Sequence, residues 1–90
     1  MSKTIGSGLV QGRMVAMERI YVMSSEIKCV GYDGDTGTLE VEFLDGCVHR
    51  YHNVPRIAHL ALMTARAKGL HFNSYIRNKF PGGKIADARE

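Results

Sequence analysis

Apolar and polar residues alternate with a two-residue period over much of the first half of the chain, as in strands with one buried face. The clearest alternation runs from Thr38 to Leu44, where two glutamates separate three apolar side chains. Shorter stretches of this kind predict strands over Glu18–Met23 and Ile27–Asp33, and a turn-forming cluster of Asp, Gly and Thr closes the second. A short helix over Met14–Ile20 is the alternative for the first stretch.

The pair Asp45-Gly46 predicts a hairpin, and the length of its loop decides which side chains of the next strand are buried. A two-residue turn would bury the Arg50 guanidinium without a partner, which is costly. A three-residue loop over 44–46, with the glycine left-handed, instead places Arg50 opposite Glu40 on the outer face. We therefore expect the second register, which pairs Phe43 with Cys47, Val41 with His49, and Leu39 with Tyr51.

After Val54-Pro55 the period changes to 3.6 residues, which is typical of amphipathic helices. The first helix is expected to end at Lys68-Gly69, with the glycine as a left-handed cap. A second helix follows from about Phe72 to Phe80 and stops at Pro81. The apolar face expected for the first helix consists of Ile57, Leu60, Ala61 and Thr64. The order of elements predicts an α+β fold, in which an antiparallel three- to four-stranded meander precedes two helices packed on one face.

Ninety residues with 44% hydrophobic and 23% charged side chains suit one small globular domain. We expect a flexible N-terminal arm over 1–16, the domain over 17–80 and a frayed C-terminal tail over 81–90. The chain has no apolar run of membrane-spanning length and no secretory signal, so we expect a cytoplasmic protein without a membrane partner. Cys29 and Cys47 are expected to remain reduced thiols.

Charge is distributed unevenly along the chain. Residues 1–48 hold seven acidic and four basic residues, whereas residues 49–90 hold two acidic and eight basic residues. All four histidines also lie in the second half. This asymmetry favours a positive surface for a polyanion or an acidic partner.

Several short motifs, taken in order, make the chain resemble the KTSC domain family, which is named after the C-terminal segment of some lysyl-tRNA synthetases and also occurs as small bacterial and phage proteins. The motifs are Ser24-Ser25, Gly31-Tyr32-Asp33, Leu39-Glu40-Val41-Glu42-Phe43, Gly46 ahead of Tyr51, Val54-Pro55, Lys68-Gly69, Phe72-Asn73 and Ile76-Arg77. The family pattern has a central Tyr-x-Tyr, of which the first position here is His49, and a serine where Ala67 stands. The resemblance implies no established activity, although RNA binding has been suggested for the family.

The sequence does not favour catalysis or metal binding. A nucleophilic enzyme needs Cys or Ser beside His and an orienting acid, but in the expected register the cysteine and histidine of the fourth strand face the packed side of the sheet. His52 points to the opposite face, so this strand does not converge on a zinc site. Gly82-Gly83-Lys84 lacks the rest of a phosphate loop. We therefore expect no catalytic residue, no metal and no cofactor.

Basic side chains near the helices form the remaining candidate site, because cations neutralise phosphates and an exposed ring stacks on an unpaired base. His52, His71, Asn73 and Tyr75 lie between these cations in the sequence. The alternative is that the cations only complement helix dipoles and keep a small protein soluble. The predicted nucleic-acid-binding residues are Arg50, Arg56, Arg66, Lys68, Arg77 and Lys79.

A second functional hypothesis is a module for protein–protein interaction or self-association. A meander with helices on one face leaves an edge strand and one sheet face open to a partner. Five methionines suit an adaptable apolar contact. Dependence on salt separates the two hypotheses, because binding to phosphates weakens steeply with salt and an apolar contact does not.

Overall fold

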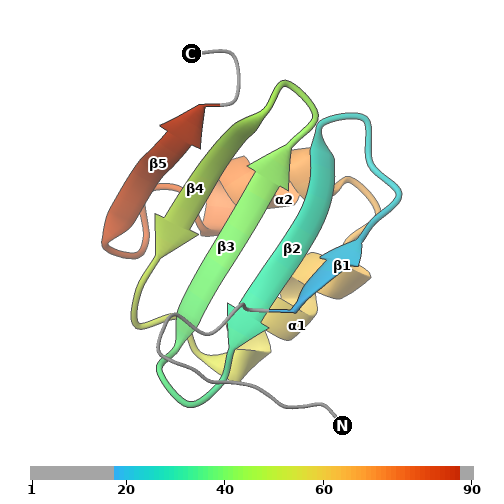
Figure 1. Cartoon of the computed structure of the whole chain (residues 1–90). Coiled ribbons are helices and arrows are strands. Elements are labelled where there is room, and N and C mark those ends of the chain that lie inside the picture. The colour runs from blue at the N-terminus through green and yellow to red at the C-terminus, as the bar shows by residue number, and fades with distance from the viewer. Residues whose placement is uncertain (1–17, 88–90) are drawn as a thin grey trace, which may run out of the picture.

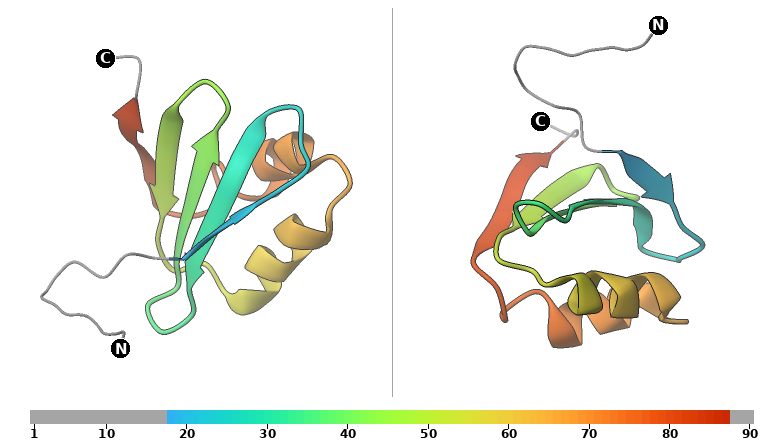
Figure 2. Two further views of the ribbon diagram at one scale, coloured as in Figure 1. Left: turned by 45° about the vertical axis from the view of Figure 1, so that its right-hand side comes forward. Right: turned by 90° about the horizontal axis from the view of Figure 1, so that it is seen from below.

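The computed structural model describes residues 18–87, which fold into one antiparallel sheet with two helices on one of its faces (Figures 1 and 2). The strands are ordered β1-β2-β3-β4-β5 across the sheet. The α+β prediction is therefore confirmed, with one strand more than expected. The elements in chain order are β1 (Arg19–Tyr21), β2 (Ile27–Asp33), β3 (Thr38–Phe43), β4 (Cys47–Tyr51), α1 (Arg56–Thr64), α2 (Lys68–Tyr75) and β5 (Gly82–Asp87).

The β3–β4 hairpin has the register that the charge argument predicts. Leu39 pairs with Tyr51, Glu40 with Arg50, and Val41 with His49. Gly46 has a φ of 96°, and its N–H donates to the Phe43 carbonyl oxygen at 3.0 Å. A left-handed glycine closes this loop because a side chain there would be strained.

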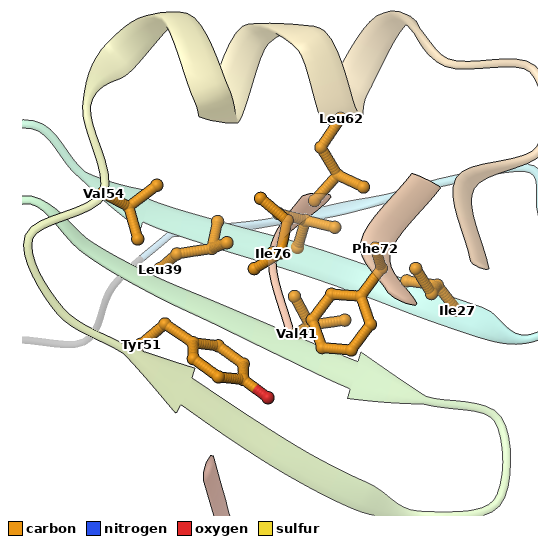
Figure 3. Close-up of a cluster of buried hydrophobic side chains, with 9 residues drawn as sticks. Ile27, Leu39, Val41, Tyr51, Val54, Leu62, Phe72 and Ile76 are labelled. Carbon is orange, nitrogen blue, oxygen red and sulfur yellow. The ribbon is translucent and has the colours of Figure 1, made fainter. Parts of the chain in front are cut away.

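The core lies between the sheet and the helices and contains side chains from both layers (Figure 3). Tyr51 on β4 and Phe72 on α2 are the largest of them, with ring centroids 5.6 Å apart in an edge-on arrangement. Edge-to-face packing is a favourable geometry for aromatic pairs. The buried cluster comprises Ile27, Val30, Leu39, Val41, Tyr51, Val54, Leu62, Phe72 and Ile76.

The expected apolar face of the first helix is wrong. In α1, Ile57 and Leu60 are 71% and 56% exposed, whereas Leu62 is completely buried and Ala58 packs against the same core. Apolar residues occupy almost every side of this helix, so periodicity alone does not single out the buried face. The extended backbone at Pro55, which enters the helix directly from the buried Val54, determines which side faces the sheet.

The expected helix boundaries also need correction. α1 ends at Thr64, and Lys68-Gly69 begins α2 instead of closing α1. The Lys68 ammonium donates to the Ala65 carbonyl oxygen at 2.7 Å, so this lysine still satisfies the end of α1. Gly69 is not left-handed; a Cβ there would collide with the Glu26 carboxylate, so close packing explains the glycine.

The expected frayed tail over 81–90 is wrong for Gly82–Asp87, which form β5 beside β4 (Figure 1). Gly82 pairs with Tyr51, and His49 pairs with Lys84. The strand lacks a clear apolar alternation, so only pairing with β4 defines it. The expected arm over 1–16 and residues 88–90 lie outside the described part of the chain.

Two neighbouring glycines of β5 should respond very differently to substitution. Gly82 has a φ of 141°, and a Cβ there would overlap the Arg50 carbonyl oxygen, whereas a Cβ on Gly83 would meet no atom within 4 Å. We expect Gly82→Ala to lower the free energy of unfolding by about 2 kcal/mol or more, and Gly83→Ala to leave it nearly unchanged. Urea unfolding of both variants tests this, and equal stabilities would contradict the described start of β5.

A row of ion pairs covers the outer face of the sheet, opposite the helices. The Glu40 carboxylate is nearly buried and contacts Arg19 at 2.6 Å and Arg50 at 2.6 Å. Burial alone would raise the pKa of Glu40, but the hydrogen bonds and charges of the two arginines lower it below its ordinary value. Glu40 thus links β3 to β4 and, across β2, to β1.

Replacing Glu40 should weaken the protein and alter its acid stability. Because the pKa of Glu40 is lowered by folding, its contribution is complete above the ordinary value of 4.5 and is lost as the pH falls through the lowered value. We expect Glu40→Gln to cost about 2 kcal/mol near neutral pH and less in acid. Glu42→Gln is the matched control, since Glu42 is more exposed and forms longer ion pairs, with Arg19 at 3.2 Å and Lys28 at 3.7 Å. Equal losses for both variants would contradict this role of Glu40.

Candidate functional site

Three adjoining hollows lie at one end of the sheet, next to α2. The β1–β2 loop and the β3–β4 turn lie at this end (Figure 1). Their volumes are about 280, 360 and 400 Å³. The first and second share Glu26 and Asn73, and the second and third share Asp45 and Arg77, so the three adjoin one another. We call them together the hairpin groove.

Cations occupy both ends of the hairpin groove. Arg66 and Lys68 line one end, and Arg77 and Lys84 line the other. Two carboxylates, Glu26 and Asp45, lie between them. Asp87 pairs with Lys84 at 3.4 Å, so the four cations face three carboxylates and the groove keeps a small excess of positive charge.

The β1–β2 loop holds the Glu26 carboxylate against the start of α2. The Ser24 hydroxyl accepts hydrogen bonds from the Glu26 and Ile27 backbone N–H groups, each at 3.1 Å. α2 has no side-chain cap and no acidic residue in its first turn. Because a helix N-terminus carries a partial positive charge, the Glu26 carboxylate next to Gly69 compensates for the missing cap.

At the other end, His49 and Tyr51 of β4 lie beside Arg77. The His49 Nδ1 atom and the Tyr51 hydroxyl are 3.1 Å apart, and the Arg77 guanidinium lies 5.9 Å from the centre of the Phe72 ring. Burial raises the pKa of Tyr51, while the charge and a hydrogen bond of Arg77 oppose that rise. Burial, followed by the charges of Arg77 and Lys84, lowers the pKa of His49. The imidazole is therefore neutral at neutral pH.

The structure brings together only part of the predicted set of cations. Arg66, Lys68 and Arg77 line the hairpin groove, although Arg66 lies between the helices and Arg77 lies beyond the end of α2. Arg50, Arg56 and Lys79 line none of the three hollows.

The three cations outside the groove have other surroundings. Arg50 is bound to Glu40 on the outer face, and the Arg56 guanidinium lies against Gly34 in the β2–β3 turn. Lys79 follows α2, and its backbone N–H donates to the Ile76 carbonyl oxygen at 3.1 Å.

Sequence reasoning missed Lys84 and His49 as members of the site. They are strand partners, and their pairing depends on β5, which the sequence pattern does not reveal. Asn73 lines the groove as well. His71 and Tyr75 stack on each other at 4.7 Å, but helical periodicity turns them away from Asn73 and the groove.

The cysteines lack the surroundings of a nucleophile. Burial, a hydrogen bond and the charge of Glu42 raise the pKa of Cys29, whose thiol donates to Glu42 at 3.3 Å. Burial, with Asp45 and Asp87 nearby, raises the pKa of Cys47. Within residues 18–87, no three His, Cys, Asp or Glu side chains are grouped so as to hold a metal ion. No helix in the same range is long and apolar enough to cross a membrane.

Comparison with known proteins shows that residues 23–80 match the KTSC domain, which is most of the described chain. The chain belongs to the KTSC domain family. The resemblance of its motifs is thus confirmed, and many of them, including Ser24-Ser25, Lys68-Gly69 and Asn73, line the hairpin groove of this KTSC domain.

Relatives of this KTSC domain occur both as small proteins and as parts of large ones. A crystal structure of a KTSC domain protein from Yersinia pestis is 41% identical, with a TM-score of 0.73, and covers 79% of this chain and 100% of its own. An uncharacterized protein of Stutzerimonas stutzeri is 39% identical over 61 residues, which are 68% of this chain and 86% of that protein. A lysine–tRNA ligase of Nostoc punctiforme is 37% identical over 74% of this chain, but the match spans only 12% of the ligase.

The stability of this KTSC domain should fall in mild acid. Burial lowers the pKa of both His49 and His59 in the folded state. Below the ordinary value of 6.5 the unfolded chain therefore binds more protons, so the free energy of unfolding decreases until the pH reaches the lowered values. Urea unfolding at a series of pH values measures the slope. His49→Gln and His59→Gln should each remove part of it, and a slope that survives in the double variant would contradict this assignment.

Proposed function

We propose that this KTSC domain is a non-catalytic module that binds single-stranded RNA along the hairpin groove. The observation that carries the proposal is the presence of Arg66, Lys68, Arg77 and Lys84 along three adjoining hollows. Cations spaced along a groove bind a phosphate backbone with little dependence on base sequence. RNA binding also agrees with the expected place of the protein in the cytoplasm.

The cations at the two ends of the groove suit successive phosphates of one strand. The carboxylates between them repel a phosphate, so uncharged parts of the ligand are expected to lie along the middle of the groove. Ser25 and Asn73, which line the middle of the groove, offer a hydroxyl and an amide for hydrogen bonds to sugars or bases. An extended single strand exposes its bases to such hydrogen bonds, whereas a duplex pairs them.

The relatives provide independent support. Two lysine–tRNA ligases, from Nostoc punctiforme and Trichormus variabilis, contain a segment that is 37% and 34% identical to this chain. An enzyme whose name includes tRNA has a use for an added RNA-binding segment. The shared segment associates this domain with tRNA ligases, and the cations of the groove supply the mechanism.

Removing charge from the groove should weaken RNA binding more than removing the same charge elsewhere. We expect the variant with Arg66, Arg77 and Lys84 changed to Gln to bind a single-stranded RNA oligonucleotide at least about tenfold more weakly at low salt, with a shallower salt dependence. Titration of the isotope-labelled protein, followed by backbone amide shifts, measures both affinity and location. Lys68 is kept in this variant because it satisfies the end of α1.

The matched control changes Lys28, Arg56 and Lys79 to Gln, which removes the same number of charges outside the groove. We expect this control to lose no more than about threefold in affinity, from the general field alone. Equal losses in the two triple variants would place the RNA elsewhere. A wild-type titration that is silent at both low and moderate salt would overturn the proposed function.

The exposed edge strand β1 favours a second candidate function, protein–protein interaction. Ile20 and Tyr21 on β1 and Met23 just after it are 47%, 74% and 91% exposed, and β1 is one of the two edge strands of the sheet. A partner strand could pair along this edge and cover these side chains. Self-association that persists at high salt in sedimentation experiments, and is lost in Tyr21→Asp, would support this candidate over RNA binding.

A further inference from the structure

We propose that the end of the hairpin groove between His49, Arg77 and Lys84 is a phosphate-binding subsite in which protonation of His49 strengthens the hold on the RNA backbone. This inference rests on the proposed function and adds to it a specific subsite and a dependence on pH. The hollow here is about 400 Å³, large enough for a phosphate with part of its nucleotide. Its walls are Phe43, Asp45, Cys47, His49, Arg77 and Lys84.

Three separate elements bring their charges to this subsite. His49 lies on β4, Lys84 is its strand partner on β5, and Arg77 follows α2. The aromatic cluster of Phe43, Phe72 and His49, with ring centroids 5.1 to 6.0 Å apart, holds the imidazole at the wall of the hollow. A phosphate placed there is held by groups that the fold has already fixed.

The contact with Tyr51 makes His49 the group that responds to pH. The buried Tyr51 hydroxyl lies 3.1 Å from His49 Nδ1, and Arg77 is close enough for its charge to act on both groups. In the tautomer that carries its proton on Nε2, a neutral His49 accepts the Tyr51 proton at Nδ1. When Nδ1 is protonated, it must donate to Tyr51 instead, and the phenol proton loses its acceptor.

Charge adds to this penalty in the absence of a ligand. Arg77 and Lys84 repel a protonated His49, while Asp45 attracts it. The other titratable groups at this end are Cys47, whose pKa is raised, and Asp87, which pairs with Lys84 at 3.4 Å. A bound phosphate reverses the balance, because its negative charge offsets all three cations at once. Binding of phosphate and binding of a proton to His49 therefore favour each other.

A short oligouridylate is a suitable probe, since neither its phosphodiesters nor its uracil rings titrate between mild acid and neutrality. We expect its affinity for the protein to increase about fivefold when the pH is lowered from about 7.5 to about 5.5 at constant salt. This lies within the limit for one linked proton, which changes an affinity by at most about tenfold per pH unit. His49→Gln should remove this dependence. His71→Gln is the matched control and should retain it, because His71 stacks on Tyr75 away from the groove.

A second measurement uses the unaltered chain, so it does not depend on how the variants fold. The imidazole signals of all four histidines are followed by NMR through a pH titration, with and without the oligouridylate. We expect the oligonucleotide to raise the pKa of His49.

Each outcome separates this inference from the proposed function. Salt-sensitive RNA binding with no response of His49 would overturn the subsite while leaving the RNA-binding function intact. A response of His49 to inorganic phosphate with none to the oligonucleotide would make this a site for free phosphate and overturn its assignment to RNA. Absence of RNA binding at both pH values would overturn the function and this inference together.

Discussion

The contact between Phe72 of α2 and the side chains of β4 holds the helical layer against the sheet, and the shape of the groove depends on it. The Phe72 ring lies 5.6 Å from Tyr51, 6.0 Å from His49 and 5.2 Å from Phe43, so one side chain of α2 touches both strands of the central hairpin. This contact fixes the side of α2 that faces the sheet, and with it the position of Gly69, Asn73 and Arg77 along the groove. Core packing thus determines which residues of this segment line the groove.

The strands were predictable because their information is local. Alternation places Leu39 and Val41 of β3 in the core, and the cost of burying Arg50 without a partner selects the hairpin register, which the pairing of Glu40 with Arg50 confirms. The site was predictable only in part. Arg66, Lys68 and Arg77 follow from the density of charge in the second half of the chain, whereas charge alone does not reveal that Glu40 holds Arg50 on the opposite face.

The features that sequence reasoning missed depend on contacts between distant segments. Lys68-Gly69 has the composition of a helix end, but the approach of Glu26 from the β1–β2 loop makes it a helix start. β5 forms by pairing with the edge of β4. Its first residue, Gly82, lets the backbone of β5 approach Arg50 closely. Lys84 belongs to the groove only as a result of that pairing. Long-range pairing of this kind leaves little trace in periodicity.

The strand directions give the domain a preferred orientation in any larger protein. β1 begins with Arg19 beside Gly31, towards the end of the sheet that lies away from the groove, whereas β5 ends with Asp87 beside Cys47, at the groove itself (Figure 1). A polypeptide joined before β1 therefore approaches from the far end of the sheet and leaves the groove accessible. One joined after β5 starts beside Cys47, at the groove, and competes for the same space. A reporter or tag on this domain is accordingly best placed at its N-terminal side.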